Sequence, residues 1–335
     1  MIEISVIVPT FNRAKSLEDT LRSICEQTLS HDRYEVIVVD NGSTDNTFML
    51  TEQFMRTRPN IRYVCEPQRG LLYCRHRGVK ESRSGNILVF IDDDIIVAKN
   101  YLEMILNTFE GHNDIVLVGG KVLPDFETCP PYWIKAFETH REGTYILSFL
   151  SLIDLGESAD YIRGDFVFGC SFSIKKDALV RCGGFNPDSF PWDMVKYRGD
   201  GETGLWHKLE GHGYKAFYNP AIVIRHKVPS SRLTDEYFCK RAYMEGVSWS
   251  FTGIRKTGRK SSYIATELYF LACIIALIPF GFYRLGWNRV NLFFIYYKVM
   301  INFFKGYRFH RIEVLKDPAL LRYVLQDTFM QETSS

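Results

Sequence analysis

The sequence lacks the cysteine patterns, the strong net charge and the biased composition that mark metal-stapled, nucleic-acid-binding, disordered or fibrous proteins. Its eight cysteines form no CxxC pair and no regular spacing, which excludes a zinc ribbon and a disulfide framework and favours a reducing cytosol. The net charge is only +2 over 335 residues, too small to indicate a nucleic-acid partner. With 46% hydrophobic and 24% charged residues, the chain is neither disordered nor fibrous and can bury a full core.

Two common nucleotide motifs and a secretion signal are also missing. No GxGxxG follows the first apolar run and no GxxxxGK[ST] occurs, which argues against a dinucleotide oxidoreductase and a P-loop ATPase. The first apolar run, residues 4–8, is too short for a signal peptide. We therefore expect the body of the protein on the cytoplasmic side of the membrane.

Residues 2–227 alternate short apolar runs with amphipathic stretches. The runs predict buried strands at residues 4–8, 35–39, 61–64, 87–91 and 115–118. Helical spacing predicts helices at 17–29, opened by a Ser16–Asp19 capping box, and at 71–82 and 100–109. Further along we expect a half-buried strand at 166–174, a helix at 201–211 and strands at 216–218 and 222–225. The whole pattern predicts a mixed α/β sheet with helices on both faces.

The composition changes near residue 234, so we divide the chain into domains at 1–234 and 235–335. Between Cys239 and Arg311, twelve Lys and Arg stand against two Glu. The apolar run 268–282 contains Pro279 and falls short of the roughly 20 residues that span a bilayer. This region predicts helices on an anionic membrane surface or a re-entrant hairpin, and a packed appendage or an oligomer interface is the alternative.

Polar side chains follow three of the predicted strands. Asp92, Asp93 and Asp94 come directly after the strand at 87–91, and adjacent carboxylates repel one another unless a cation with hard oxygen ligands joins them. Residues 9–12 and 40–43 follow two other strands, although each is also ordinary turn chemistry. Because ligands bind at the carboxyl ends of strands in such sheets, the sequence predicts one crevice holding a divalent metal and a nucleoside.

Five motifs occur in the order typical of one enzyme family. They are VIVPTFNR, VIVVDNGSTDNT, GNILVFIDDD, GGFN, and an acidic helix start followed by Ile224-Arg225-His226. Over roughly residues 4–227 the chain resembles the family-2 glycosyltransferases. The resemblance implies a GT-A fold, with a C-terminal helical extension here, and inverting transfer of a sugar from a nucleotide-diphosphate sugar, UDP-sugar being favoured.

The resemblance also implies which residues hold the donor. Asp94 is the expected direct ligand of Mn²⁺ or Mg²⁺, Asp92 lies nearer the ribose or sugar, and His226 completes the metal shell or touches the diphosphate. Asp40 is expected at the nucleotide base. The remaining donor-site residues are Pro9, Thr10 and Asn12 around the nucleoside, Arg69 and Arg75 beside the diphosphate, and Asp93 within the acidic cluster.

An inverting single displacement needs a carboxylate that takes the proton of the acceptor hydroxyl. Counting back from Lys208 places Glu202 on the family's base position, and Asp200 is a competitor two residues earlier. Both could instead favour only the helix N-terminus electrostatically. Trp192, just before this loop, is a candidate for stacking on a sugar or for ordinary packing.

The acceptor is expected to be a glycan or a polyprenyl-diphosphate-linked sugar in cell-surface polysaccharide synthesis, handled at the cytoplasmic face of the membrane. Two other functions use similar residues: a nucleotidyltransferase, and a catalytically silent scaffold that binds sugar nucleotides. The first would be expected to carry a Gly-rich loop near the first strand, and the second would not need Asp92, Asp94 and Glu202 intact.

Overall fold

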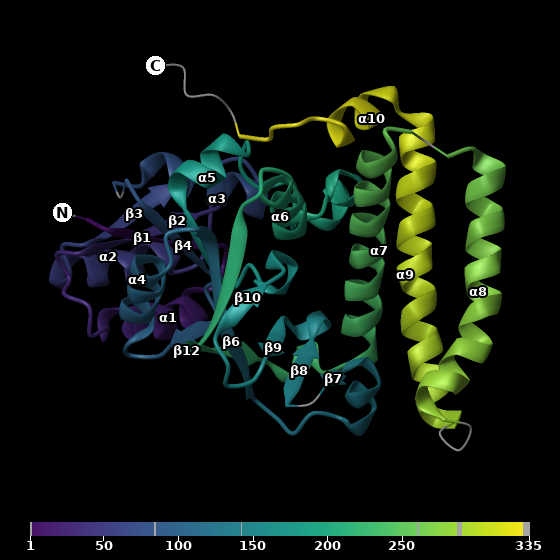
Figure 1. The fold of residues 1–335 in the computed structure, drawn as a ribbon, viewed down its shortest axis with the longest axis horizontal. Coiled ribbons are helices and arrows are strands. Elements are labelled where there is room, and N and C mark those ends of the chain that lie inside the picture. The colour runs from purple at the N-terminus through teal and green to yellow at the C-terminus, as the bar shows by residue number, and fades with distance from the viewer. Residues whose placement is uncertain (1, 84, 142, 260, 287–289, 331–335) are drawn as a thin grey trace.

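The computed structural model describes residues 2–83, 85–141, 143–259, 261–286 and 290–330 (Figure 1). A mixed sheet forms its centre, with the strand order β3-β2-β1-β4-β11-β6 and small strands continuing beyond β6. The strands on this path are β1 (Ile4–Thr10), β2 (Tyr34–Asp40), β3 (Ile61–Cys65), β4 (Ile87–Ile91), β6 (Ile115–Phe126), β11 (Ser171–Lys175), β9 (Leu152–Asp154), β8 (Thr144–Leu147) and β7 (Thr139–Arg141).

The first four strands in this order are parallel, and β11 runs antiparallel between β4 and β6. Every residue of β1, β2 and β4 is buried, because helices cover both faces of a parallel sheet. The covering helices are α1 (Ala14–Cys25), α2 (Thr47–Thr57), α3 (Leu71–Glu81), α4 (Tyr101–Gly111), α5 (Lys176–Arg181) and α6 (Gly201–Gly211). The predicted mixed α/β sheet is confirmed.

Three local predictions are wrong. The Ser16–Asp19 capping box does not form: α1 begins at Ala14, whose backbone N–H donates to Asp45 Oδ2 at 3.0 Å, so Ser16 lies inside the first turn. The strand predicted over 166–174 is shortened to β11, because residues 164–166 form a 3₁₀ turn that leads into the cleft described below. A separate omission is the helix α2, for which there was no prediction.

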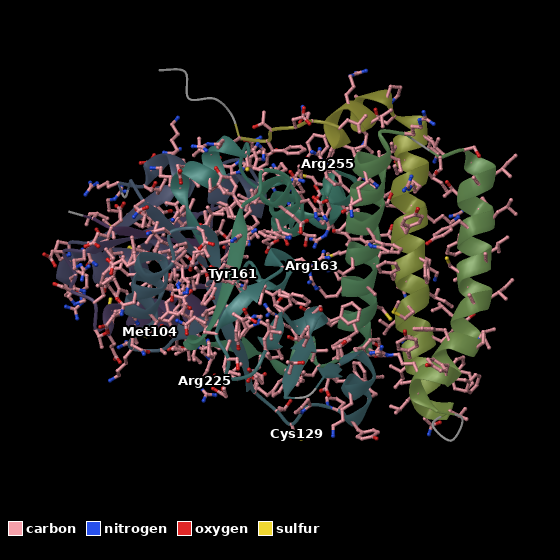
Figure 2. All side chains as sticks on the ribbon, in the orientation of Figure 1. Met104, Cys129, Tyr161, Arg163, Arg225 and Arg255 are labelled. Carbon is pink, nitrogen blue, oxygen red and sulfur yellow. The ribbon has the colours of Figure 1, made fainter. Side chains whose placement is uncertain are left out.

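The third wrong prediction concerns strand number. The two strands predicted at 216–218 and 222–225 are a single strand, β12 (Lys215–Val228), with an irregularity in register between Tyr218 and Val223. It pairs with β6, β5 (Ile95–Val97) and β10 (Asp160–Ile162). Along its second half Arg225 is exposed at the edge of the molecule (Figure 2), whereas the next residue, His226, is buried.

The C-terminal region is a layer of helices beside the sheet domain. It comprises α7 (Asp235–Thr257), α8 (Tyr263–Leu285), α9 (Val290–Lys316) and the short α10 (Pro318–Val324), with α9 standing between α7 and α8 (Figure 1). Glycines permit the close approach of α7 and α9, since a Cβ on Gly246 would overlap the carbonyl oxygen of Phe303. Phe238 on α7 and Val299 on α9 belong to the main hydrophobic core, so this layer is packed onto the sheet domain.

The helix α8 is longer than predicted. It spans 23 residues, continues through Pro279, and is long and apolar enough to cross a membrane by length and composition. Ile264, Leu268 and Ile275 are each more than half exposed, and side chains of α8 project away from α9 (Figure 2).

Several cations of the basic region bind within the protein. Arg308 makes two bonds to Glu267, of 2.7 and 2.6 Å, and Lys298 bonds to Asp235 at 2.6 Å. Arg284 donates to the carbonyl oxygens of Ala136 and Glu138. Arg308 and Lys298 join helices of the layer to one another, and Arg284 joins the layer to residues 136–138. Part of the positive charge of this region is therefore bound within the protein.

The segment after α10 returns to the sheet domain. It passes over α6 towards α5 (Figure 1). There the backbone N–H groups of Phe329 and Met330 both donate to the carbonyl oxygen of Gly183, at 3.4 and 3.3 Å. The chain therefore crosses from the helical layer back to the first domain.

Candidate active site

A cleft of about 880 Å³ opens where the carboxyl ends of β1 and β4 meet α7. The acidic cluster Asp92–Asp94 forms one part of its wall. The turn at 165–170, the start of α6, His226 on β12 and the inner face of α7 form the rest. The cleft therefore joins the strand ends of the sheet domain to the helical layer.

Asp93 and Asp94 are buried and paired with cations. Asp93 accepts hydrogen bonds from Thr10 Oγ1 at 2.7 Å and from Arg13 at 2.9 Å. The same Arg13 nitrogen lies 2.9 Å from Asp94, which also accepts from Arg232 at 2.7 Å. Burial raises the pKa of Asp93 to about 6 despite these partners.

Asp94 shows the opposite shift. Burial by itself would raise the pKa of Asp94, but the nearby His226, Arg232 and Arg13 hold it well below its usual value. The His226 Nε2 atom lies 3.4 Å from Asp94 Oδ1 and 2.9 Å from Arg232. Its other ring nitrogen, Nδ1, is buried and has no hydrogen-bond partner among the described residues.

Asp92 stands apart from these pairs. It lines the cleft, and no hydrogen bond to its carboxylate occurs within the described part of the chain. Burial and the charge of Asp94 raise its pKa. A carboxylate of this kind is available for a ligand that brings positive charge or donors into the cleft.

A second charged cluster lies farther along the cleft, around Glu202. Arg75 is buried between two carboxylates, 3.4 Å from Glu202 and 3.5 Å from Asp188. Arg198 holds the other oxygen of Asp188 at 3.3 Å. Burial and the charge of Asp188 raise the pKa of Glu202 to about 6, whereas Arg198 and Arg75 outweigh burial and lower the pKa of Asp188.

The competitor, Asp200, has a different environment. Its Oδ1 accepts from the Asn186 amide and its Oδ2 from the Thr252 hydroxyl, both at 2.7 Å. A Cβ on Gly204 would overlap both Asp200 and Asn186, so the absence of a side chain there makes room for this arrangement. Asp200 therefore ties the start of α6 to α7, and Glu202 is the carboxylate of the pair without such neutral partners.

Most residues predicted for the donor, the metal and the base line the cleft, and two do not. Those that line it are Pro9, Thr10, Arg69, Arg75, Asp92, Asp93, Asp94, Asp200, Glu202 and His226. Asp40 is buried behind its wall and accepts from Ser43 and from the Tyr63 hydroxyl, at 2.6 and 2.7 Å. Asn12 has φ +53° and accepts from the backbone of Thr44 at 2.7 Å. Both hold neighbouring turns in place.

Sequence reasoning missed several charged residues of the cleft. Two of them could have been found from the sequence, because Arg13 is the last residue of the first motif and Asp188 follows the GGFN motif by two residues. Arg198 stands two residues before Asp200, in the loop already predicted for the site, whereas Arg232 and Arg241 had no signal because only folding brings their segments to the cleft.

The fold and the position of the acidic cluster define a GT-A class of α/β protein, as the sequence predicted. The sequence profile described as glycosyl transferase family 2 matches residues 5–178, and the chain belongs to this family.

Individual relatives are distant. The glucosyl-dolichyl phosphate glucuronosyltransferase of Haloferax volcanii is 24% identical over 249 residues, which are 74% of this chain and 76% of that protein. The chain spans less than two thirds of several other curated relatives that it matches. Among solved structures, mannosyltransferase PcManGT from Pyrobaculum calidifontis in complex with GDP-Man and Mn²⁺ has a TM-score of 0.53 and 22% identity, covering 73% of this chain and 62% of that one.

A second solved structure covers the helical layer as well. TarS 1–349 from S. aureus has a TM-score of 0.50 and 16% identity, and the match covers 94% of this chain and 92% of that chain. At such identities both structures show the fold alone.

Proposed function

We propose that this protein is an inverting glycosyltransferase that moves a sugar from a nucleotide-diphosphate sugar, UDP-sugar being favoured, to a glycan or lipid-linked acceptor. The observation that carries the proposal is one cleft with two separate carboxylate centres, Asp92–Asp94 and Glu202. The first suits the charged leaving group, and the second suits removal of a proton.

The side chains around Asp94 fit a divalent cation that is shared with a substrate. Within the described ranges no three acidic, His or Cys side chains already surround one point. Mg²⁺ in phosphate sites is commonly held by only one or two carboxylates, and the phosphates and waters complete its shell. The Asp92 carboxylate, which lines the cleft, and His226, whose Nε2 lies 3.4 Å from Asp94 Oδ1, provide such ligands beside Asp94.

We assign the metal to Asp94, Asp92 and His226. The mannosyltransferase PcManGT, solved with GDP-Man and Mn²⁺, supports a divalent cation in this role. A divalent cation, when bound, neutralises charge on the departing nucleoside diphosphate as a Lewis acid. Arg13 and Arg232, which now bind Asp93 and Asp94, are the cations nearest this centre and can pair bidentately with phosphate oxygens.

Glu202 acts as the general base. Its raised pKa, about 6, leaves it ionised at neutral pH and able to accept a proton. The buried Arg75 beside it holds the carboxylate in position. The chain's own residues thus orient the donor at Asp92–Asp94 and receive the acceptor's proton at Glu202.

We place the enzyme at the cytoplasmic face of a membrane, with α8 as the contact. The support is the exposed apolar surface of α8 and the lipid-linked substrate named for the Haloferax relative. Residues 1–234 form the catalytic domain and 235–335 the membrane-associating region in this proposal, and the region after α7 leaves room for an oligomer contact.

A donor screen tests the function. Purified protein is incubated with a panel of UDP- and GDP-sugars with Mn²⁺ or Mg²⁺, and release of nucleoside diphosphate is measured. We expect turnover of at least one donor, its loss in excess chelator, and its loss in Asp94→Ala with the circular dichroism spectrum retained. Full turnover in chelator would exclude the metal, and no turnover of any donor would count against the proposed activity.

A further inference from the structure

Two tryptophans lie near the Glu202 end of the cleft, and the structure gives them different surroundings. Trp192 packs on Tyr243, with ring centroids 5.3 Å apart, and Lys240 covers its ring at 5.5 Å. It is not among the described residues that line the cleft, whereas Trp249 on α7 is. The two side chains are about equally exposed, Trp249 at 55% and Trp192 at 51%, so the place of Trp249 in the wall of the cleft is what distinguishes it.

The position of Trp249 relative to Glu202 is fixed by hydrogen bonds on both sides of it. Its neighbour Ser248 accepts from Arg198 Nε at 3.1 Å. One turn later, Thr252 donates to Asp200 at 2.7 Å. Arg198 and Asp200 bracket the short loop that leads into Glu202. The Trp249 ring itself is supported by Phe303 at 5.4 Å between centroids.

The charges at this end of the cleft are balanced. Each cation is paired with a carboxylate: Arg75 with Glu202 and Asp188, Arg198 with Asp188, and Arg241 with Glu245 at 3.2 Å. Three arginines thus meet three carboxylates, so this end of the cleft has no net positive charge that would favour a phosphate.

The chemistry of the nucleophile points the same way. A phosphate oxygen is already anionic at neutral pH, so it needs no base, and the neighbouring carboxylates of Glu202 and Asp188 would repel it. A sugar hydroxyl is uncharged and does need a base. An exposed indole beside paired charged side chains offers a sugar ring both an apolar face to cover and hydrogen-bonding partners around its edge.

We propose that the reacting end of the acceptor is an uncharged sugar ring that stacks on Trp249, and that a phosphate monoester is not an acceptor. This inference rests on the proposed function and specifies its acceptor. In the step, the acceptor hydroxyl oxygen forms the bond to the anomeric carbon of the donor. The bond from that carbon to the diphosphate oxygen breaks, its electron pair leaves with the nucleoside diphosphate, and the hydroxyl proton passes to Glu202.

The test compares two acceptor probes with the 335-residue chain and the donor found by the screen. One is a panel of p-nitrophenyl hexosides, and the other is a polyprenyl monophosphate in detergent. We expect transfer to a hexoside and none to the monophosphate. Trp249→Ala should raise the KM for the hexoside about tenfold, as loss of one aromatic contact would. Trp249→Phe should restore most of the affinity.

Donor hydrolysis without acceptor is measured in every sample, and Trp192→Ala is the matched control. Unchanged hydrolysis in Trp249→Ala shows that the donor site is intact, and Trp192→Ala should leave the hexoside KM unchanged. Transfer to the monophosphate in preference to hexosides would overturn the inference, as would equal effects of the two tryptophan variants. Absence of donor turnover in the wild type would instead overturn the proposed function itself.

Discussion

The hydroxyl group of Thr252 on α7 donates a 2.7 Å hydrogen bond to Oδ2 of Asp200, the residue that directly precedes α6. The amide of Asn186 satisfies the other oxygen. Glu202, two residues later, has instead Arg75 and the charged Asp188 as neighbours. This contrast separates a carboxylate that joins two helices from one that can exchange a proton.

Glu202→Gln should lower transfer to acceptor by about 10²–10⁴-fold and leave donor and metal affinity unchanged. The matched variant Asp200→Asn should keep most of the transfer rate, but it should lower the free energy of unfolding by about 1–3 kcal/mol, since one buried hydrogen bond loses its acceptor. Transfer assays and chemical denaturation measure the two effects. If Asp200→Asn were inactive and Glu202→Gln active, the general base would be Asp200 and not Glu202.

The pH profile of transfer should show an acid limb near pH 6. The base must be ionised, and burial together with Asp188 raises the pKa of Glu202 to about 6, so the rate falls as pH drops through this value. The other charges facing Glu202 are Arg75, which opposes the shift, and Asp92, which adds to it.

Asp188→Asn should move this acid limb to lower pH, because it removes the like charge beside Glu202. Asp193→Asn is the control, since the Asp193 carboxylate is exposed and contacts Arg69 instead. An acid limb that stays in place in Asp188→Asn would show that another group controls it.

Gly169→Ala should lower the transfer rate by about 100-fold, which is the effect of a displacement of about 1 Å in a reacting group. A Cβ at this position would overlap Oε1 of Glu202 and Nη2 of Arg75, so both must move. Gly111→Ala, where a Cβ meets nothing within 4 Å, should have no effect. Steady-state transfer rates of the two variants are compared with that of the wild type, after thermal unfolding has shown that the proteins are equally stable.

Asp40→Ala should lower the free energy of unfolding by about 1–3 kcal/mol, because it leaves Tyr63 and Ser43 without their buried acceptor. Weaker donor binding should accompany this loss, since the adjoining Asn41 lines the cleft. Urea denaturation and donor titration measure the two quantities. Weaker donor binding at unchanged stability would instead favour direct contact of Asp40 with the nucleotide base of the donor.

The α8 surface should bind lipid through apolar contact. Changing Leu268, Leu271 and Ile275 to Gln should release the protein from vesicles, because these exposed side chains supply the buried area. About 0.5 M salt and the exposed-charge variant Lys305→Glu should release little. Release by salt, with the Gln variant still bound, would point to electrostatic attachment.

The sequence was sufficient where a local pattern determines structure. The β-branched runs gave β1, β2 and β4, and the position of Asp92–Asp94 after β4 followed from them. It was insufficient where distant segments meet. The partners of Asp200 come from residues 186 and 252, and Trp249 was overlooked in favour of Trp192, which is nearer in sequence to Glu202. Local propensity also missed the start of α1, where the acceptor is Asp45.

The return of the chain to Gly183 affects how the protein is made. During synthesis, residues 1–234 emerge from the ribosome first. Trp249, which forms part of the wall of the cleft, emerges later, and so do Phe329 and Met330, which bond to Gly183. The early segment must therefore wait in an unfinished state, with the core positions of Phe238 and Val299 unfilled. The wall of the cleft is complete only once Trp249 and Phe303 have been synthesised, so a product that ends before α7 would lack this part of it.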